Sequence, residues 1–150
     1  MFKFLSDVVT NATVSADWIG IRAVKDIARA CAIRDAHPER NTQQFDQGAM
    51  VEVLAQGQFG YSATNNLSAA SLAAAIVSAY EQAIAASQWA VHRFTTEVRP
   101  MATGSYVSPH RKELGSLSPA ELNQILLQVC DRLNVSDKIA QTTASARSHD

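Results

Sequence analysis

Two short runs of strand-like sequence, joined by a turn that contains glycine, constrain the fold of this chain most strongly. Met50–Leu54 and Gln58–Thr64 flank Gln56-Gly57, a connection of the length and composition that closes a β-hairpin. A hairpin pairs its strands antiparallel, whereas parallel strands need a long crossover between them. The sequence therefore predicts an antiparallel meander and not a parallel sheet interleaved with helices.

The second run of the hairpin has two different faces. Phe59 and Tyr61 share one face, and Gly60 lies on the other, where its missing side chain lets another backbone or a helix approach closely. We interpret the two aromatic residues first as core residues under the helix expected over Ala70–Ala90, and as ligand contacts in second place.

Further strands are expected before the hairpin. Trp18–Ala23 alternates apolar with other residues, as a strand with one buried face does, and Lys25-Asp26 would make the turn after it. A second strand follows at Ala28–Asp35, and His37-Pro38 would break it, because proline cannot donate to a ladder. Arg40–Phe45 is a third, polar run.

Helices are expected at three places. Phe2–Ala12 has apolar residues at helical spacing, Ser68 caps a helix that extends to about Trp89, and Ser118-Pro119-Ala120-Glu121 is a capping box. Ile139–Ser148 alternates weakly, as an edge strand does. The expected buried face of the last helix consists of Leu122, Ile125, Leu126, Val129 and Leu133.

These elements predict an α+β fold. It has an N-terminal helix, an antiparallel meander of about four to five strands, a covering helix, an irregular crossing over Val91–Ser116, a second long helix and a terminal edge strand. We expect a first domain at 1–98, a crossing segment at 99–116 and the start of a following, truncated domain at 117–150. The terminal strand has no visible partner, which favours an incomplete unit, with a frayed tail as the alternative.

Composition limits the classes of function. The 150 residues are 47% hydrophobic and 18% charged, enough for one core without metal or disulfide. The formal net charge of −1 gives no general attraction to nucleic acid or anionic lipid. Cys31 and Cys130 lie far apart and form no CxxC pair, which favours a reducing, cytoplasmic location. Cys31 is expected in a strand that faces the core and Cys130 beside the buried face of a helix, so we expect both to be packing residues. Polar residues interrupt the apolar stretches Met1–Val9 and Ala69–Ala90, so we expect a soluble protein with no membrane contact.

No catalytic or cofactor motif is visible. His37, His92, His110 and His149 stand outside any HExxH arrangement, no serine has a GxSxG context, and the glycines lack the spacing of a phosphate-binding loop. We therefore expect no catalytic, cofactor-binding or metal-binding residues in this chain. A small-molecule domain has no motif in its favour.

One segment has a local excess of positive charge. Between Val91 and Lys112 four basic residues, Arg93, Arg99, Arg111 and Lys112, stand against the single acidic Glu97. A solvated loop is the preferred interpretation, and contact with an acidic partner is the alternative.

Three separated stretches carry a resemblance to a known family. Gly48–Ser68 reads GAMVEVLAQGQFGYSATNNLS, Ala16-Asp17-Trp18 is followed by Arg22, and Gly104–Pro109 reads GSYVSP. In this order, and over nearly the whole chain, they resemble the N-terminal domain of the TldD/PmbA family, although Glu52 stands where the family tends to have arginine. The matched motif residues, which we interpret as mainly structural, are Gly57, Phe59, Gly60, Tyr61 and Thr64.

The resemblance implies a function for a longer protein. Members of the family are metal-dependent peptidases, linked to maturation of peptide antibiotics and removal of small unfolded proteins, and were named modulators of DNA gyrase. The resemblance also implies a dimer, in which the N-terminal sheet helps to form a groove for an extended peptide. Their HExxxH metal motif lies in the later half, which implies that the metal, expected to be zinc, binds a C-terminal part beyond Asp150.

Two hypotheses of different classes follow. The chain is the substrate-groove domain of a TldD/PmbA-like peptidase and is inactive alone, or it is a stand-alone interaction module that pairs with a catalytic relative or modulates DNA gyrase. Either role implies a homo- or heterodimer without direct nucleic-acid binding. A reading frame that continues past Asp150 to the family's NSxG stretch and its HExxxH motif would favour the first, and a stop codon would favour the second.

Overall fold

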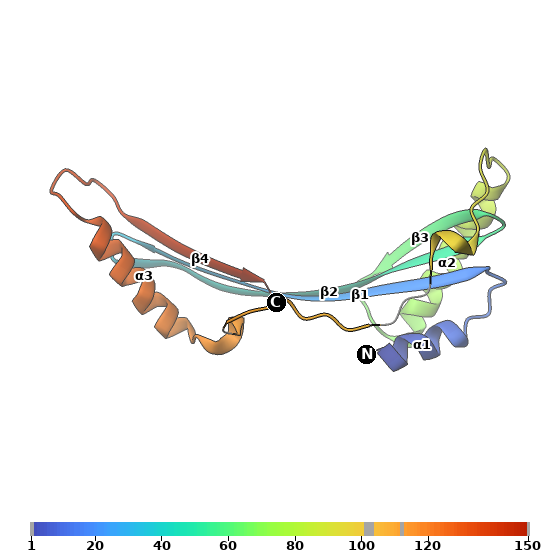
Figure 1. Cartoon of the computed structure of the whole chain (residues 1–150), viewed down its shortest axis with the longest axis horizontal. Helices are drawn as coiled ribbons and strands as arrows, with labels where there is room; N and C mark the ends of the chain where they lie inside the picture. Colours follow the sequence, from blue (N-terminus) through green and yellow to red (C-terminus); the bar gives the residue numbers. More distant parts are fainter. Residues whose placement is uncertain (1, 101–103, 112, 150) are drawn as a thin grey trace. The chain divides into compact units, whose positions relative to one another are not determined.

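The computed structural model describes residues 2–100, 104–111 and 113–149, which include a four-stranded sheet in the order β3-β2-β1-β4 (Figure 1). The predicted α+β class, with an N-terminal helix, an antiparallel sheet and a terminal edge strand, is confirmed. In chain order the elements are α1 (Phe2–Thr10), β1 (Trp18–Arg34), β2 (His37–Ala55), β3 (Gln58–Thr64), α2 (Ala69–Ser87), the 3₁₀ turns η1 (Thr96–Val98) and η2 (Leu114–Ser116), α3 (Pro119–Leu133) and β4 (Thr143–His149).

The chain forms two compact units. The first consists of Met1–Val24 with Gln47–Ser105, and the second of Lys25–Asp46 with Tyr106–Asp150, so that β1 and β2 each contribute one part to both. The domain division into 1–98, 99–116 and 117–150 stays a prediction.

The first two strands are longer than the sequence pattern indicates. The predicted turn at Lys25-Asp26 is wrong, because β1 runs without interruption from Trp18 to Arg34. The chain reverses instead at Asp35 and Ala36, whose φ angles of 47° and 61° fit the tight type I′ turn of a hairpin.

The predicted break at His37-Pro38 is also wrong, because β2 begins at His37 and contains Pro38. β3 pairs with Ala49–Ala55 of β2, and no described strand pairs with the same edge of β2 before that point. A proline whose missing N–H faces such an unpaired edge removes no ladder hydrogen bond. The polar run Arg40–Phe45 is the exposed middle of this strand.

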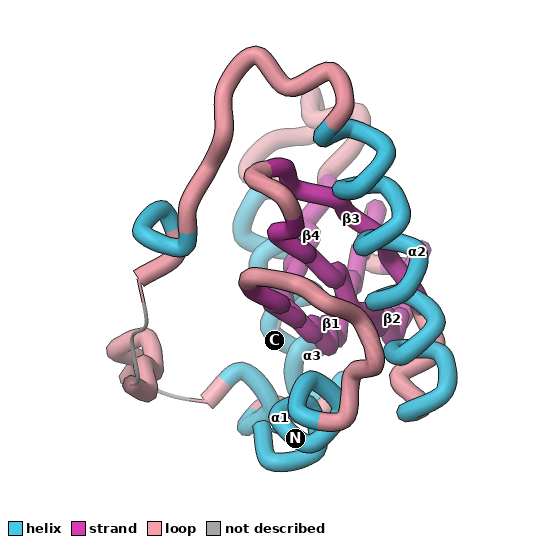
Figure 2. The backbone as a smooth tube through the Cα atoms, turned by 90° about the vertical axis from the view of Figure 1, so that its right-hand side faces the viewer, coloured by secondary structure: helices cyan, strands magenta, loops and turns pink. Residues whose placement is uncertain are grey.

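The core of the first unit lies between the sheet and α2, which runs alongside β3 (Figure 2). The predicted close approach at Gly60 is confirmed, because a Cβ atom there would lie 1.9 Å from the carbonyl oxygen of Ala79 in α2. The predicted alternation in β1 is confirmed as well, since Ile19 and Ile21 pack against this core. Its buried members are Val8, Ala49, Val51, Val53, Ala55, Leu72, Ala75, Ile76, Ala79 and Ala83.

The helix α2 has the length and mean hydropathy of a membrane-crossing helix, a property that core helices of soluble proteins share. Leu72, Ile76 and Ala83 of this helix are buried, and Tyr80 and Ile84 pack against the same core. The side chain of Ser68 accepts a hydrogen bond from the N–H of Ser71 and caps the helix as predicted. Packing in the first unit uses one side of this helix, because 28% of its apolar window is buried.

The second unit buries a smaller cluster under α3, consisting of Cys31, Ile33, Leu126, Cys130 and Ala144. Both cysteines are packing residues, as predicted. The terminal strand β4 does have a partner, contrary to the expectation, because it pairs antiparallel with Ala28–Arg34 of β1. The capping box between Ser118 and Glu121 is present.

The predicted buried face of α3 is partly wrong. Ile125, Val129 and Leu133 are 40 to 47% exposed, and Cys130 takes their place in the cluster. Leu122, Leu126 and Cys130 follow one another at intervals of four residues, so the buried stripe lies beside the predicted one.

Gly60→Ala tests the close packing of α2 on β3. The added methyl group would force the α2 backbone away from the sheet, and we expect a loss of at least about 2 kcal/mol in the free energy of unfolding, measured by chemical denaturation. Gly104→Ala is the matched control, because a Cβ atom at Gly104 meets nothing within 4 Å. Equal stability of the two variants would contradict the packing described.

Candidate functional site

The position of Gly60 under α2 determines on which face of the sheet Phe59 and Tyr61 lie. Side chains alternate along β3, so Phe59 and Tyr61 lie on the face of the sheet opposite α2. The interpretation of both as core residues under that helix is therefore wrong. Tyr61 remains 47% exposed, and Phe59 is half-buried by neighbours on its own face.

Phe59 is the centre of an aromatic cluster. Its ring lies 6.5 Å from Trp18 in an edge-to-face arrangement, 6.3 Å from Tyr61 in a stacked one and 5.4 Å from Phe94. We call Trp18, Phe59, Tyr61 and Phe94 the aromatic face. It joins β1, β3 and the segment after α2, and such pairs stabilise beyond their buried area alone.

An ion pair crosses the aromatic face. Nε of Arg99 donates to Oε2 of Glu52 at 3.1 Å, and its second terminal nitrogen donates to Oε1 at 2.6 Å. The guanidinium group lies 4.8 Å from the centre of the Phe59 ring and 5.9 Å from that of Trp18. The N–H groups of the arginine thus bind the carboxylate, while its planar guanidinium group lies over the aromatic rings.

The ion pair changes the titration of its neighbours. The hydrogen bond from Arg99 lowers the pKa of Glu52, and partial burial raises it. The hydrogen bond is the larger effect, so the pKa is lowered overall. The same hydrogen bond raises the pKa of Arg99, and burial followed by the contact with Glu52 raises the pKa of Tyr61. Glu52 therefore stays ionised at neutral pH in spite of its partial burial.

The segment that carries Phe94 and Arg99 is fixed to the hairpin turn. The N–H of Phe94 donates to the carbonyl oxygen of Gly57 at 2.9 Å, and Arg93 donates to that of Gln56 at 3.1 Å. Gly57 itself has a φ of 77°, which favours glycine. The preferred interpretation of this basic segment as a solvated loop is wrong for Arg99, which pairs with Glu52, while Arg93 and Arg111 are exposed and Lys112 lies outside the described residues.

A hollow of about 390 Å³ opens beside the ion pair. It is lined by Trp18, Gly20, Ile21, Arg22, Met50, Glu52, Tyr61 and Arg99. Two arginines and one glutamate give this lining a net positive charge. The sequence pattern singled out Trp18, Tyr61 and Arg99 separately but did not show that they lie together, because they are far apart along the chain.

One edge of β1 borders this hollow. β4 pairs with Ala28–Arg34, and among the described residues no strand pairs with the same edge of β1 over Trp18–Val24. We call this stretch the open edge. An open edge presents unpaired N–H and C=O groups to any extended chain that approaches it.

The hairpin register determines which residues face the open edge. Ala55 and Gln58 flank the two-residue turn as a hydrogen-bonded pair, so the even-numbered residues of β2 bond to β1. Trp18 contacts Phe59, which lies opposite Leu54 of β2, and directly paired residues share a face, so we infer that the even-numbered residues of β1 pair with those of β2. The residues between them direct their main-chain groups outward, and they are Ile19, Ile21 and Ala23.

The other singled-out residues do not converge on a site. Thr64 ends β3, and its hydroxyl accepts from the N–H of Asn66 at 3.1 Å. Nδ1 of His37 and of His110 each contacts a nearby carbonyl oxygen, and His149 lies 3.4 Å from Asp26. Within the parts of the chain that the structure describes, no three His, Cys, Asp or Glu side chains are placed to hold a metal ion.

The comparisons identify the hairpin region. Residues 30–87 match the family model for domain 1 of the PmbA/TldA metallopeptidases. Over these residues the chain is similar to the TldD/PmbA family. The motif residues from Gly57 to Thr64 lie inside the match, so the resemblance of the sequence to this family is confirmed. No curated protein sequence matches the chain.

Solved structures share the fold of the chain. A protein from Bacteroides thetaiotaomicron, described as a candidate modulator of DNA gyrase, is 18% identical with a TM-score of 0.62, over 99% of this chain and 33% of its own. A protein from Thermotoga maritima with the same description is 12% identical with a TM-score of 0.54, over 99% of this chain and 35% of its own. The chain spans about a third of their length.

Glu52→Gln tests the ion pair that crosses the aromatic face. Because the folded-state pKa of Glu52 is lowered, its stabilising contribution is present above the ordinary value of 4.5 and is lost as the pH falls through the folded pKa. We expect the variant to unfold at lower denaturant concentration than the original at about pH 7, and this gap to be smaller at an acidic pH below 4.5, where the folded-state carboxylate becomes protonated.

Glu39→Gln is the control for this measurement. Glu39 pairs with Arg34 at 2.9 Å, but the two side chains are 42% and 49% exposed, and exposed pairs contribute little. We expect no gap at either pH. A pH-dependent gap of the same size in both variants would show that the Glu52 pair has no special role.

Proposed function

We propose that this chain is the non-catalytic, substrate-side domain of a TldD/PmbA-like metallopeptidase and binds peptides or small unfolded proteins in extended form. The open edge of β1 carries this proposal. A peptide that adds to a sheet edge gains main-chain hydrogen bonds whatever its sequence, which suits a substrate without a fixed structure. The neighbouring hollow supplies side-chain contacts on one face of the added strand.

Hydrolysis itself is assigned to another part. The described side chains do not fit a metal ion, because no three His, Cys, Asp or Glu side chains among them are placed to hold one. When bound elsewhere, a metal such as zinc would activate water for attack on the peptide bond. The residues of this chain would hold the peptide straight and fix its register.

The proposal includes partners and a location. A catalytic C-terminal part or a catalytic relative completes the site, in a cytoplasmic homo- or heterodimer without direct contact to nucleic acid or membrane. The alternative is a stand-alone interaction module that pairs with a catalytic relative or modulates DNA gyrase. The description of the matched family as metallopeptidase favours the first.

Ala23→Pro tests peptide binding at the open edge. The substitution removes an outward N–H and leaves the pairing with β2 in place, because proline is tolerated on an unpaired edge. We expect the immobilised chain to retain a mixture of random, proline-free peptides of about ten residues, and the variant to retain them about threefold to tenfold more weakly.

Ala23→Ser keeps the N–H and is the matched control, with binding close to that of the original chain. Circular dichroism of all three proteins checks that the fold is intact. Failure of the original chain to retain any peptide would refute the proposed function, and equal retention by the two variants would refute the open edge as its site.

A further inference from the structure

A strand added to the open edge alternates its side chains between two different surfaces. Residues of the added strand that stand opposite Ile19, Ile21 and Ala23 share their face, which is the face covered by α1 and α2. The residues between them stand opposite Gly20 and Arg22 and lie on the face of the Glu52 hollow. The two faces differ in polarity, so they favour different side chains.

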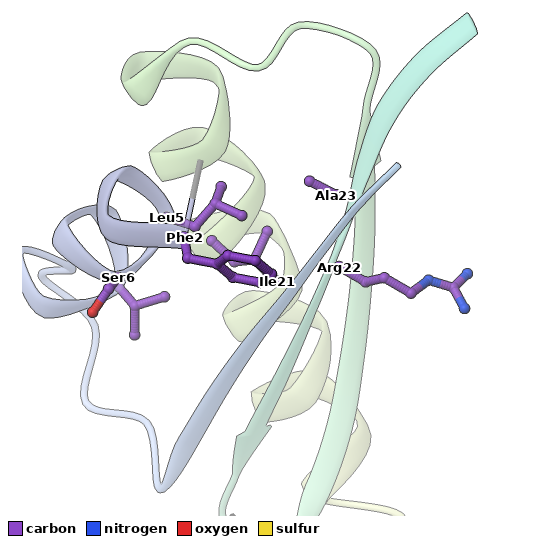
Figure 3. A pocket seen from close by; sticks show the side chains of 7 residues that line it. Phe2, Leu5, Ser6, Ile21, Arg22 and Ala23 are labelled. Atoms are coloured by element: carbon purple, nitrogen blue, oxygen red, sulfur yellow. The ribbon is translucent and has the colours of Figure 1, made fainter. Parts of the chain in front are cut away.

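The face covered by α1 has an apolar hollow of about 500 Å³ at the open edge. Figure 3 shows Phe2 and Leu5 of α1 and Ile21 of β1 meeting in this hollow. Val9 and Ala23 complete its apolar wall, Ser6 and Arg22 also line it, and Phe2 is 91% exposed. Covering these side chains with a large apolar residue would remove apolar surface on both partners from water.

The opposite face is positively charged at the edge. Arg22 is exposed, and Figure 3 shows its side chain pointing away from α1. The Glu52 carboxylate beside it is held by Arg99, so it competes weakly for the Arg22 guanidinium group. A carboxylate on the added strand would therefore find a cation with few competing contacts.

We propose that the open edge selects an extended peptide segment in which large apolar and acidic side chains alternate. The apolar residues enter the α1 hollow, and the acidic residues face Arg22. This inference rests on the proposed function and adds a sequence preference to a mode of binding that is otherwise indifferent to sequence.

Two synthetic peptides of about seven residues, the length of the open edge, test the preference. In the first, leucine and glutamate alternate, and in the second the same residues stand in two blocks, so that composition and net charge are equal. Fluorescence anisotropy with labelled peptides measures both dissociation constants. We expect the alternating peptide to bind about tenfold more tightly, since burial of one leucine accounts for a difference of that size.

Two variants assign the preference to its hollow and its charge. Ser6 is an exposed residue of α1 that lines the hollow, so Ser6→Phe fills it without removing a core side chain. We expect this variant to lose the advantage of the alternating peptide, whereas Ser105→Phe, on an exposed loop, keeps it. Arg22→Gln should weaken binding of the alternating peptide by about threefold to tenfold and remove its dependence on salt.

The outcomes separate this inference from the proposed function. Equal affinity for both peptides, with weaker binding by Ala23→Pro, would overturn the preference and leave the binding of extended peptides intact. No binding of either peptide would refute both. Loss of the advantage in Ser105→Phe to the same extent as in Ser6→Phe would refute the hollow as its cause.

Discussion

The contact between Gly60 and the backbone of α2 is the constraint on which the first unit depends. A helix that lies this close to a strand leaves no space for a side chain, so β3 can present only one of its two faces to α2. A shift of the register by one residue would bring Phe59 or Tyr61 against the helix and expose the apolar residues of the core. The arrangement therefore fixes the aromatic face on the outer side of the sheet.

The outer side of the sheet then needs its own stabilisation. The segment after α2 supplies it by placing Phe94 on Phe59 and Arg99 on Glu52. The ion pair is only partly buried, so it escapes much of the desolvation cost of a fully buried pair. The result is a packed surface of aromatic and paired charged side chains beside an edge of the sheet that no described strand covers.

Local chemistry made part of this fold predictable from the sequence. The Gln56-Gly57 turn, the Gly60 position and the Ser68 and Ser118 caps depend on a few neighbouring residues, and each was predicted correctly. The continuity of β1 and β2 was not, because exposed strands carry polar residues such as Lys25 and Asp26 that otherwise mark turns. The Glu52 and Arg99 pair was missed because 47 positions separate the residues, although the local charge excess was a signal.

Hydrogen exchange at the backbone of β1, followed by nuclear magnetic resonance, tests the central claim most directly. In the free chain the amides of Ile19, Ile21 and Ala23 should exchange fast, and those of Gly20 and Arg22, which bond to β2, should exchange slowly. Saturation with the alternating peptide should slow the first three and leave the other two unchanged. Slowed exchange at Asn41–Phe45 of β2 instead, with no change in β1, would contradict the account.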